Sequence, residues 1–377
     1  MGMGLGLTIP LLALLMDGMN VSASMIGINT AMPALAGILV VPFVPSLTHR
    51  LGVRNLILIC LFISVICLFL FRVYMNIWFW FPIRFVFGAS LGILFVVSEF
   101  WINSIAPEHE RGRILGVYTT VMSAGFATGP VILAVVGTEG WTPFLILMGL
   151  MSAATLPVFW GSGGTPSLEH SSSVDLPKYL RLAPTAMLAA GVFGALETGV
   201  FNFMPIYGIR NGLSGETAAL ALTAVALGNM TLQYPVGMLA DRIDRRLVLL
   251  MCALVGFVGI ATLPPLIGTT SWTGGQPILL YLSLFVWGGT LTGMYTVGLT
   301  LLGQRFQGSA LISANAGFVV LYEIGALGGP PLSGYAMDLW NPHGLVIAMG
   351  CVCLGYAGLI LYRHGPDFLA KGVTGQR

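Results

Sequence analysis

Twelve apolar stretches, separated by short polar segments, run along almost the whole chain. They cover residues 1–16, 25–47, 55–74, 78–103, 113–137, 142–161, 183–206, 215–239, 247–268, 277–303, 309–336 and 342–363. A helix needs about 20 mostly apolar residues to cross a bilayer. Continuous apolar runs of this length exclude a membrane β-barrel, whose strands alternate between apolar and polar positions. The pattern therefore predicts an all-α integral membrane protein with twelve transmembrane helices.

The longest polar connector, residues 162–182, has six apolar stretches before it and six after it. We therefore expect an N-terminal six-helix bundle (1–161), a linker (162–182), a C-terminal six-helix bundle (183–363) and a tail (364–377). The first stretch, residues 1–16, would rise about 24 Å as a helix, which is less than the roughly 30 Å of the hydrocarbon core. We expect this helix to be truncated, with the true N-terminus upstream.

Basic residues concentrate on alternate connectors and on the C-terminal tail. These residues are Arg50, Arg54, Arg111, Arg113, Lys178, Arg181, Arg242, Arg245, Arg246, Arg305, Arg363, Lys371 and Arg377. The opposite connectors hold Arg72 and Arg210, and Arg84 lies within an apolar stretch. Because cytoplasmic loops of membrane proteins are enriched in Lys and Arg, both termini and the linker are predicted to be cytoplasmic.

Composition agrees with this class of protein. The chain is 56% hydrophobic and 8% charged, whereas an average soluble domain is roughly 25% charged. This excludes a soluble enzyme and a nucleic-acid-binding protein. The five cysteines fall inside apolar stretches, where we expect them to be buried. The sequence contains no metal-binding or nucleotide-binding motif, so we expect no metal and no cofactor.

Two sets of residues recur at nearly constant spacing, which indicates an internal repeat. Leu47, Arg50 and Arg54 recur as Leu239, Arg242 and Arg246 at an offset of 192, after the second stretch of each half. Gly125, Gly129 and Pro130 recur as Gly325, Gly329 and Pro330 at an offset of 200, in the fifth stretch of each half. The chain is thus predicted to be a tandem of two six-helix units. The Gly-Pro pairs allow these helices to bend.

Three motifs make the chain similar to the major facilitator superfamily over its whole length. Residues 237–246, Gly-x-Leu-Ala-Asp-Arg-x-Asp-Arg-Arg, resemble the loop signature of the family, whereas the N-terminal copy has His49 in place of the acidic residue. The pattern Arg84-Phe-x-x-Gly88-x-x-x-Gly92 resembles the arginine motif of the fourth helix. Residues 116–130, with Gly116, Gly125, Gly129 and Pro130, resemble the fifth-helix motif of proton-coupled antiporters, without its trailing Gly-Gly.

The resemblance implies two six-helix bundles around a central cavity, the major facilitator fold, and alternating access by rocking of the halves. The residues Arg84-Phe-Val, Val96-Val97-Ser98-Glu99 and Met204-Pro205-Ile206-Tyr207 look most like the YcaD-type bacterial members. A bacterial inner membrane is therefore the expected location.

Two glutamates lie deep inside apolar stretches and are candidates for proton coupling. Glu323 is predicted near the membrane midplane, and Glu197 is also well inside the hydrocarbon. A carboxyl there can bind and release a proton as access alternates between the two sides. The alternative for Glu323 is a hydrogen-bonded tie between helices through neighbouring Tyr322. Glu197 has the same two interpretations, because Asn202 and Thr198 are close enough in sequence to satisfy its carboxyl.

Other charged residues are predicted to act in gating or in the cavity. Glu99 lies at the depth of the cytoplasmic arginines, so an ion pair with Arg50 or Arg54 would stabilise one gate state. Asp241, Arg242 and Arg246 are interpreted as a conformational latch, or as solvated loop charges. Arg84 has three open roles: binding an anionic substrate, pairing with an acid, or packing as part of a proton relay.

The resemblance implies that the first, fourth, seventh and tenth helices line the cavity. On the tenth, Trp287, Leu291 and Met294 share a helical face, with Tyr295 adjacent. On the seventh, Phe201 and Asn202 precede the Met204-Pro205 pair. Such an aromatic and thioether surface suits an amphipathic organic solute, although the same stripe is also typical of helix packing.

These features predict a secondary active transporter that couples a small organic solute to protons, without enzymatic activity. The fifth-helix motif favours export by antiport, and an uptake symporter is the alternative. A non-transporting membrane sensor is a further alternative from a different class. The expected partners are a small-molecule substrate, protons and the lipid bilayer, with no nucleic acid, and the expected state is a monomer.

Overall fold

Helices are the only regular elements in the described part of the chain, residues 1–105, 111–160, 176–273 and 277–374 of a computed structural model. The N-terminal half contains α1 (Gly2–Gly18), α2 (Ala23–Thr30), α3 (Met32–Val40), the 3₁₀ turn η1 (Val41–Phe43), α4 (Val44–Leu51), α5 (Val53–Val73), α6 (Ile77–Ile105), α7 (Arg111–Val136), α8 (Thr142–Ala153) and α9 (Thr155–Trp160). The C-terminal half contains α10 (Leu176–Leu182), α11 (Pro184–Arg210), α12 (Gly215–Arg242), α13 (Arg245–Ala261), α14 (Leu263–Thr273), α15 (Ile278–Arg305), α16 (Gly308–Leu339) and α17 (Gly344–Thr374).

These helices correspond to the twelve apolar stretches of the sequence. Among the described residues, eight helical segments are long and apolar enough to cross a membrane, and α1 and part of α7 form shorter apolar helices. The second, sixth and ninth stretches are each divided into consecutive helices, and α10 lies in the predicted linker. Large apolar side chains such as Phe62, Trp78 and Leu279 are exposed on the outside of the bundle. An apolar exterior of this extent is typical of a surface that faces lipid.

Prolines account for the interruptions in the second stretch. Pro33, Pro42 and Pro45 each stand at the first or second position of α3, η1 and α4. Proline lacks a backbone N–H and disfavours helical geometry in the residue before it, so each proline begins a new element. The predicted helix over 25–47 is therefore a run of short consecutive helices, which together form one candidate span over Ala23–Leu51.

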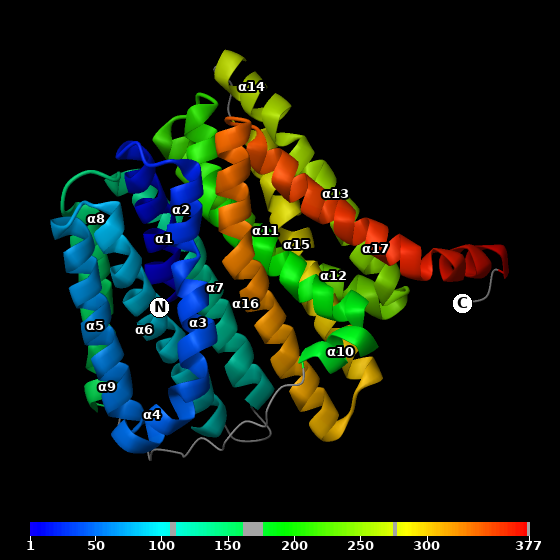
Figure 1. Cartoon of the computed structure of the whole chain (residues 1–377), viewed down its shortest axis with the longest axis horizontal. Coiled ribbons are helices and arrows are strands. Elements are labelled where there is room, and N and C mark those ends of the chain that lie inside the picture. Colours follow the sequence, from blue (N-terminus) through cyan, green and yellow to red (C-terminus); the bar gives the residue numbers. More distant parts are fainter. Residues whose placement is uncertain (106–110, 161–175, 274–276, 375–377) are drawn as a thin grey trace.

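The two halves lie side by side, with the N-terminal half on the left of Figure 1 and α16 and α7 near the middle. Contact between the halves is made by α2 with α16 and by α7 with α12. The first contact is between backbones, because a Cβ on Gly27 would lie 2.3 Å from the Pro330 carbonyl oxygen. A Cβ on Gly334 would lie 2.1 Å from the Ala23 carbonyl oxygen. Glycine is thus required where these two helices cross.

The repeated glycines serve the same purpose inside each half. A Cβ on Gly129 of α7 would lie 2.3 Å from the Gly6 carbonyl carbon of α1. A Cβ on Gly329 of α16 would lie 2.3 Å from the Ala195 carbonyl oxygen of α11. Helices α7 and α16 both continue through the prolines that follow these glycines. The repeat found in the sequence therefore corresponds to two equivalent helix pairs, α1–α7 and α11–α16, in which backbones approach closely.

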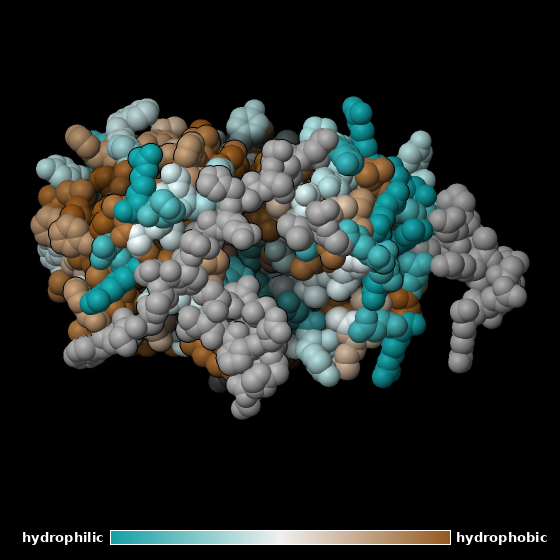
Figure 2. Space-filling view, turned by 90° about the horizontal axis from the view of Figure 1, so that it is seen from below, coloured by the Kyte–Doolittle hydropathy of each residue, from teal (hydrophilic) through white to brown (hydrophobic). Residues whose placement is uncertain are grey.

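The two ends of the bundle differ in charge. We call the end with Arg54, Arg242, Arg245 and Arg305 the basic end and the opposite end, with Arg210, the far end. The basic end is at the bottom of Figure 1, and in the view from below (Figure 2) hydrophilic residues gather on the right, over the C-terminal half.

Three features differ from the predicted arrangement. The chain start lies about midway between the two ends (Figure 1), where Gly2 packs against Met122 of α7, and not at the basic end. Helix α17 continues to Thr374, so the predicted tail from residue 364 is helical over most of its length. Four of the five cysteines are buried, whereas Cys351 is exposed on α17.

Candidate functional site

Glu197 and Tyr322 join the two long helices of the C-terminal half. The Tyr322 hydroxyl on α16 donates a hydrogen bond to Glu197 Oε2 on α11, over 2.8 Å. The neighbours that were expected to satisfy Glu197 instead bond within and beside their own helix. Thr198 Oγ1 donates to the Gly194 and Ala326 carbonyls, and Asn202 Nδ2 donates to the Thr198 carbonyl. The tie between helices that was considered for Glu323 is thus made by Glu197.

Glu323 lies one residue beyond Tyr322 and faces the other half of the molecule. A Cβ placed on Gly37 of α3 would lie 3.5 Å from Glu323 Oε2, so α3 runs directly past this carboxyl. The side chain is half-buried. It makes no hydrogen bond or ion pair with any residue in the described part of the chain. The two glutamates therefore share one region, with Glu197 inside the C-terminal half and Glu323 at the boundary between halves.

Aromatic rings surround the two glutamates on the C-terminal side. Tyr295 of α15 lies 6.0 Å from Tyr322, 5.6 Å from Phe193 of α11 and 5.0 Å from Phe318 of α16, measured between ring centroids. Tyr322 also lies 5.8 Å from Phe193. Edge-on and tilted contacts of this kind are favourable and fix ring positions. The predicted cavity residue Tyr295 is thereby placed beside the glutamates.

The other predicted residues of α15 point elsewhere. Trp287 donates from Nε1 to the Gly256 carbonyl of α13 over 2.9 Å, and Met294 packs against the same glycine. Both side chains are at most 2% exposed. Trp287 and Met294 therefore pack between α13 and α15 inside the C-terminal half, on a different face of α15 from Tyr295.

Phe201 and Asn202 lie on α11 where it approaches the N-terminal half. The Phe201 ring packs edge-on against Phe126 of α7, with 5.0 Å between centroids. This contact joins the two halves. Asn202 is 4% exposed, and its Oδ1 has no hydrogen-bond partner among the described residues. Phe201 is thus a boundary residue, and Asn202 carries a buried acceptor that no described residue satisfies.

Arg84 lies on α6 inside the N-terminal half and is 3% exposed. Its Nη1 is 3.5 Å from Oδ1 of Asn29, on the last turn of α2. Asn29 itself is fully buried, and its Nδ2 has no partner among the described residues. Burial of Arg84 agrees with its predicted position inside a span. Its partner, Asn29, was not identified from the sequence.

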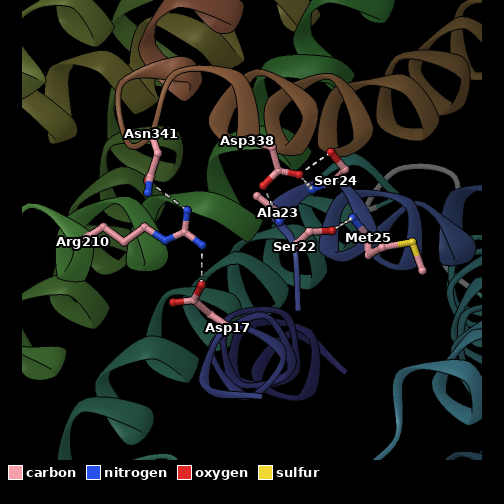
Figure 3. A network of polar contacts seen from close by, with 8 residues as sticks. All are labelled: Asp17, Ser22, Ala23, Ser24, Met25, Arg210, Asp338 and Asn341. Carbon is pink, nitrogen blue, oxygen red and sulfur yellow. Dashed lines mark hydrogen bonds and ion pairs between the residues drawn. The ribbon is translucent and has the colours of Figure 1, made fainter. Parts of the chain in front are cut away.

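A polar network at the far end joins the two halves, as shown in Figure 3. Arg210 of α11 forms a 2.7 Å ion pair with Asp17 of α1 and donates to Asn341 Oδ1 over 3.1 Å. Asp338 of α16 accepts hydrogen bonds from the backbone N–H groups of Ala23 and Ser24, at 2.9 and 2.8 Å, and from the Ser24 hydroxyl. Asp338 thereby caps α2 of the opposite half.

Sequence reasoning missed this network, although one signal was present. Arg210 is one of two basic residues on connectors of the far side. The positive-inside rule disfavours such residues, so each is a candidate for a specific contact. The other, Arg72, donates from Nε to the Gly140 carbonyl within its own half.

At the basic end, the predicted latch residues contact their own halves. Arg245 Nη2 forms a 3.2 Å ion pair with Asp241, and Arg246 Nη1 is 3.3 Å from His364 Nδ1 of α17. Both Asp241 and Arg242 are exposed. In the N-terminal half, Arg54 Nη2 donates to the Phe159 carbonyl over 2.8 Å.

The expected pair of Glu99 with Arg50 or Arg54 is not formed in this conformation between these described residues. Glu99 is exposed on α6. Its pairing therefore stays a prediction for another conformation. Within the described ranges, no group of three or more His, Cys, Asp or Glu side chains is placed to hold a metal ion.

Comparison with known proteins gives the same fold. The family model described as Major Facilitator Superfamily matches residues 1–220 and 186–377. The MFS-type transporter YfkF of Bacillus subtilis is 26% identical over 357 residues, covering 91% of this chain and 88% of that protein. The MFS-type transporter YcaD of Shigella flexneri is 26% identical over 299 residues, covering 77% of this chain and 74% of that protein.

Solved structures of transporters also superimpose on the chain. The nucleoside transporter NupG matches with a TM-score of 0.75 at 15% identity, covering 96% of this chain and 94% of that one. A D-xylose-proton symporter matches with a TM-score of 0.70 at 16% identity, covering 95% and 94%. At these identities the likeness concerns the fold. The family model spans both halves and the relatives are MFS-type transporters, so the chain belongs to the Major Facilitator Superfamily.

Proposed function

We propose that the chain is a proton-coupled secondary transporter that moves a small organic solute across a bacterial inner membrane by alternating access. Membership of the family supports transport, and the excess of basic residues supports a cytoplasmic position for the basic end. In this orientation the far-end network closes the outer side. The protein works as a monomer, with one solute path between its two halves.

The position of Glu323 is the observation that carries proton coupling. Its carboxyl stands at the boundary between halves, beside Gly37 of α3, and pairs with no cation in the described part of the chain. When the halves rock, a boundary carboxyl meets water first from one side and then from the other. It can therefore take up a proton on one side and release it on the other.

Glu197 is the second member of the proposed proton site. The Tyr322 hydroxyl holds its carboxyl to the turn of α16 that carries Glu323. A change in the charge of one glutamate is thereby felt by the other across a short, mostly apolar region, where charges interact strongly. Substrate cavity residues on this side are Tyr295 and Phe201, beside the glutamates and at the Phe126 contact.

Closure of the basic end in the opposite state is assigned to the charged residues there. Asp241, Arg242 and Arg246 of the C-terminal half would meet Arg50, Arg54 and Glu99 of the N-terminal half. The resemblance of residues 116–130 to the antiporter motif favours export, with a proton entering as the solute leaves. In an uptake symporter, the solute and the proton would enter together.

The test uses purified protein in liposomes with a trapped pH indicator. Organic anions, nucleosides, vitamins and drug-like cations are added singly, and proton movement is recorded with wild type, Glu323→Gln and Glu197→Gln. Glu139→Gln is the matched control, because Glu139 is exposed in the loop before α8. We expect a solute-dependent proton signal that falls at least about tenfold in Glu323→Gln, as loss of an essential group requires.

The sign of the signal decides the direction of coupling. Solute outside that drives protons out of the liposome indicates antiport, and protons moving with the solute indicate symport. Saturable solute flux that is unchanged in Glu323→Gln, with no proton signal, would contradict coupling. Absence of saturable flux for every solute would favour the non-transporting sensor.

A further inference from the structure

Arg84 and Arg210 differ in the hydrogen-bond and ion-pair partners that the protein gives them. Arg210 is about one-quarter exposed and has both a carboxylate and an amide oxygen within 3.1 Å. Arg84 is 3% exposed, and its contact with Asn29 is at 3.5 Å. It forms no ion pair with a carboxylate anywhere in residues 1–105, 111–160, 176–273 and 277–374. The more deeply buried cation therefore has the weaker set of partners.

Such a site is energetically incomplete. A guanidinium carries five N–H donors, and a buried charge without a counterion is unfavourable for the folded state. Next to it, Asn29 Nδ2 is a second buried donor without a partner among the described residues. Because Oδ1 of Asn29 points to Arg84, its amide group lies against the guanidinium. Asn29 of α2 and Arg84 of α6 are thus adjacent buried polar side chains, and Asn29 contributes a buried nitrogen that no described residue satisfies.

The surrounding backbone holds this arrangement in place. A Cβ on Gly88 would lie 2.4 Å from Pro33 Cα, so α6 and α3 touch one turn along from Arg84 and Asn29. Helix α2 ends at Thr30, directly after Asn29, and α3 begins at Met32. The one residue between them, Ala31, keeps helical backbone angles, so Asn29 lies within a candidate span that continues from α2 into α3.

We propose that Arg84 and Asn29 bind the carboxylate of the transported solute, which is therefore an organic anion. The planar fork of a guanidinium matches the two oxygens of a carboxylate, and the Asn29 amide adds a third donor to the same anion. This assignment rests on the proposed transport function and names its substrate class. It also separates the tasks of the halves: the N-terminal half holds the anion, and the glutamates of the C-terminal half carry the proton.

The test measures ligand-dependent thermal stability of the purified protein in detergent. The probes are benzoate, lactate, succinate and glutamate, each beside its neutral amide, with phenyl phosphate as a separate arm. At least one carboxylate is expected to raise the Tm by about 2 °C or more, because a ligand that binds the folded state stabilises it. Its amide is expected to leave the Tm unchanged.

Variants locate the binding site. Arg84→Gln and Asn29→Asp are expected to abolish the shift, the second because its own carboxylate would pair with Arg84. Arg84→Lys keeps the charge and is expected to weaken binding about tenfold, since it loses the bidentate geometry. Thr30→Val is the matched control, because the Thr30 hydroxyl bonds the Gly27 carbonyl of its own helix. It is expected to keep the full shift.

Each contrary result overturns the proposal. These results are equal shifts from carboxylates and amides, a carboxylate shift that survives both Arg84→Gln and Asn29→Asp, a shift from phenyl phosphate alone, and no shift from any probe. Liposome flux separates this proposal from proton coupling. Carboxylate flux that depends on Arg84 but moves no protons would support the anion site and contradict proton coupling. Proton movement that is driven by a neutral or cationic solute would support proton coupling and contradict the anion site.

Discussion

The helix pairs α1–α7 and α11–α16 are packed in the same way but carry different side chains at mid-height. In both pairs a glycine of the later helix, Gly129 or Gly329, touches the backbone of the earlier one. At the same offset of 200, however, Tyr322 and Glu323 of α16 correspond to Met122 and Ser123 of α7. The N-terminal half instead carries a buried cation, Arg84. Packing is thus duplicated between the halves, while ionisable chemistry belongs to each half separately.

The largest effect is expected from breaking the shared packing. Gly129→Ala and Gly329→Ala each place a Cβ about where backbone atoms of the partner helix now lie, at 2.3 Å. Overpacking of this kind destabilises a protein by about 1–3 kcal/mol, or more where backbone must move. We expect both variants to lose monodisperse protein on heating at clearly lower temperatures than wild type.

Two further glycines provide controls for this prediction. A Cβ added to Gly149 of α8 or to Gly355 of α17 would have no atom within 4 Å, so Gly149→Ala and Gly355→Ala should be tolerated. A strong effect in one half with tolerance in the other would show that the two pairs are not equivalent in energy.

The next effect concerns the hydrogen bond between Tyr322 and Glu197, which joins the pair α11–α16 and has no counterpart at the equivalent position of the pair α1–α7. Tyr322→Phe removes the hydroxyl that donates to Glu197 Oε2. Leaving a buried acceptor unsatisfied destabilises a protein by about 1–3 kcal/mol. A lower Tm is expected, measured by thermal unfolding in detergent. Tyr335→Phe on the same helix is the control, since Tyr335 is 60% exposed. Equal Tm values for the two variants would contradict a structural role for this bond.

Much of this comparison was visible in the sequence. The twelve stretches, the division into halves and the repeat at offsets of 192 and 200 depend on hydrophobic runs and on spacing, which are local signals. The division of the second stretch into short helices was not predicted, although Pro33 and Pro42 mark the places where it occurs. Depth along a helix was estimated from the constant rise per residue, and these depths stay predictions. Hence Arg84 and Glu197 were identified as residues inside spans.

The direction of a side chain around a fully buried helix was not predictable in this way. Trp287 and Met294 face α13, whereas Tyr295, the residue after Met294, faces α11 and α16. When every face of a helix is apolar, periodicity does not show which neighbour each face meets. The far-end network was missed for a related reason. Asp17 and Arg210 are 193 residues apart, and only the packing of the halves brings them together.

A smaller effect is expected at this far-end contact, which compares a bond between halves with one inside a half. Arg210→Ala removes the ion pair with Asp17, whereas Arg72→Ala removes a contact within the N-terminal half. A partly exposed ion pair contributes up to about 1 kcal/mol, which is about fivefold in a conformational equilibrium. We therefore expect a cysteine placed at Val21 to react up to about fivefold faster with an impermeant maleimide in Arg210→Ala.

The charge-swapped pair sharpens this result. Asp17→Arg combined with Arg210→Asp should return the labelling rate toward that of wild type, because the ion pair is restored with reversed polarity. Arg72→Ala should leave the rate unchanged. Faster labelling in both arginine variants would point to general loosening of the far end and not to a contact between halves.

The smallest effect on stability is expected at the basic end, where the halves differ by one acid. The C-terminal copy of the loop motif has Asp241, paired with Arg245, whereas the N-terminal copy has His49. Asp241, near the end of α12, is 71% exposed, and an exposed ion pair with Arg245 at the start of α13 contributes at most about 1 kcal/mol. Asp241→Asn should therefore leave the Tm almost unchanged.

If the acid acts as a latch in the opposite state, the same variant should still reduce solute flux in liposomes. Glu216→Gln, at the other end of α12, should reduce neither. Unchanged flux in Asp241→Asn would reduce the motif to solvated loop charges, and the asymmetry between the two copies would then have no consequence for transport.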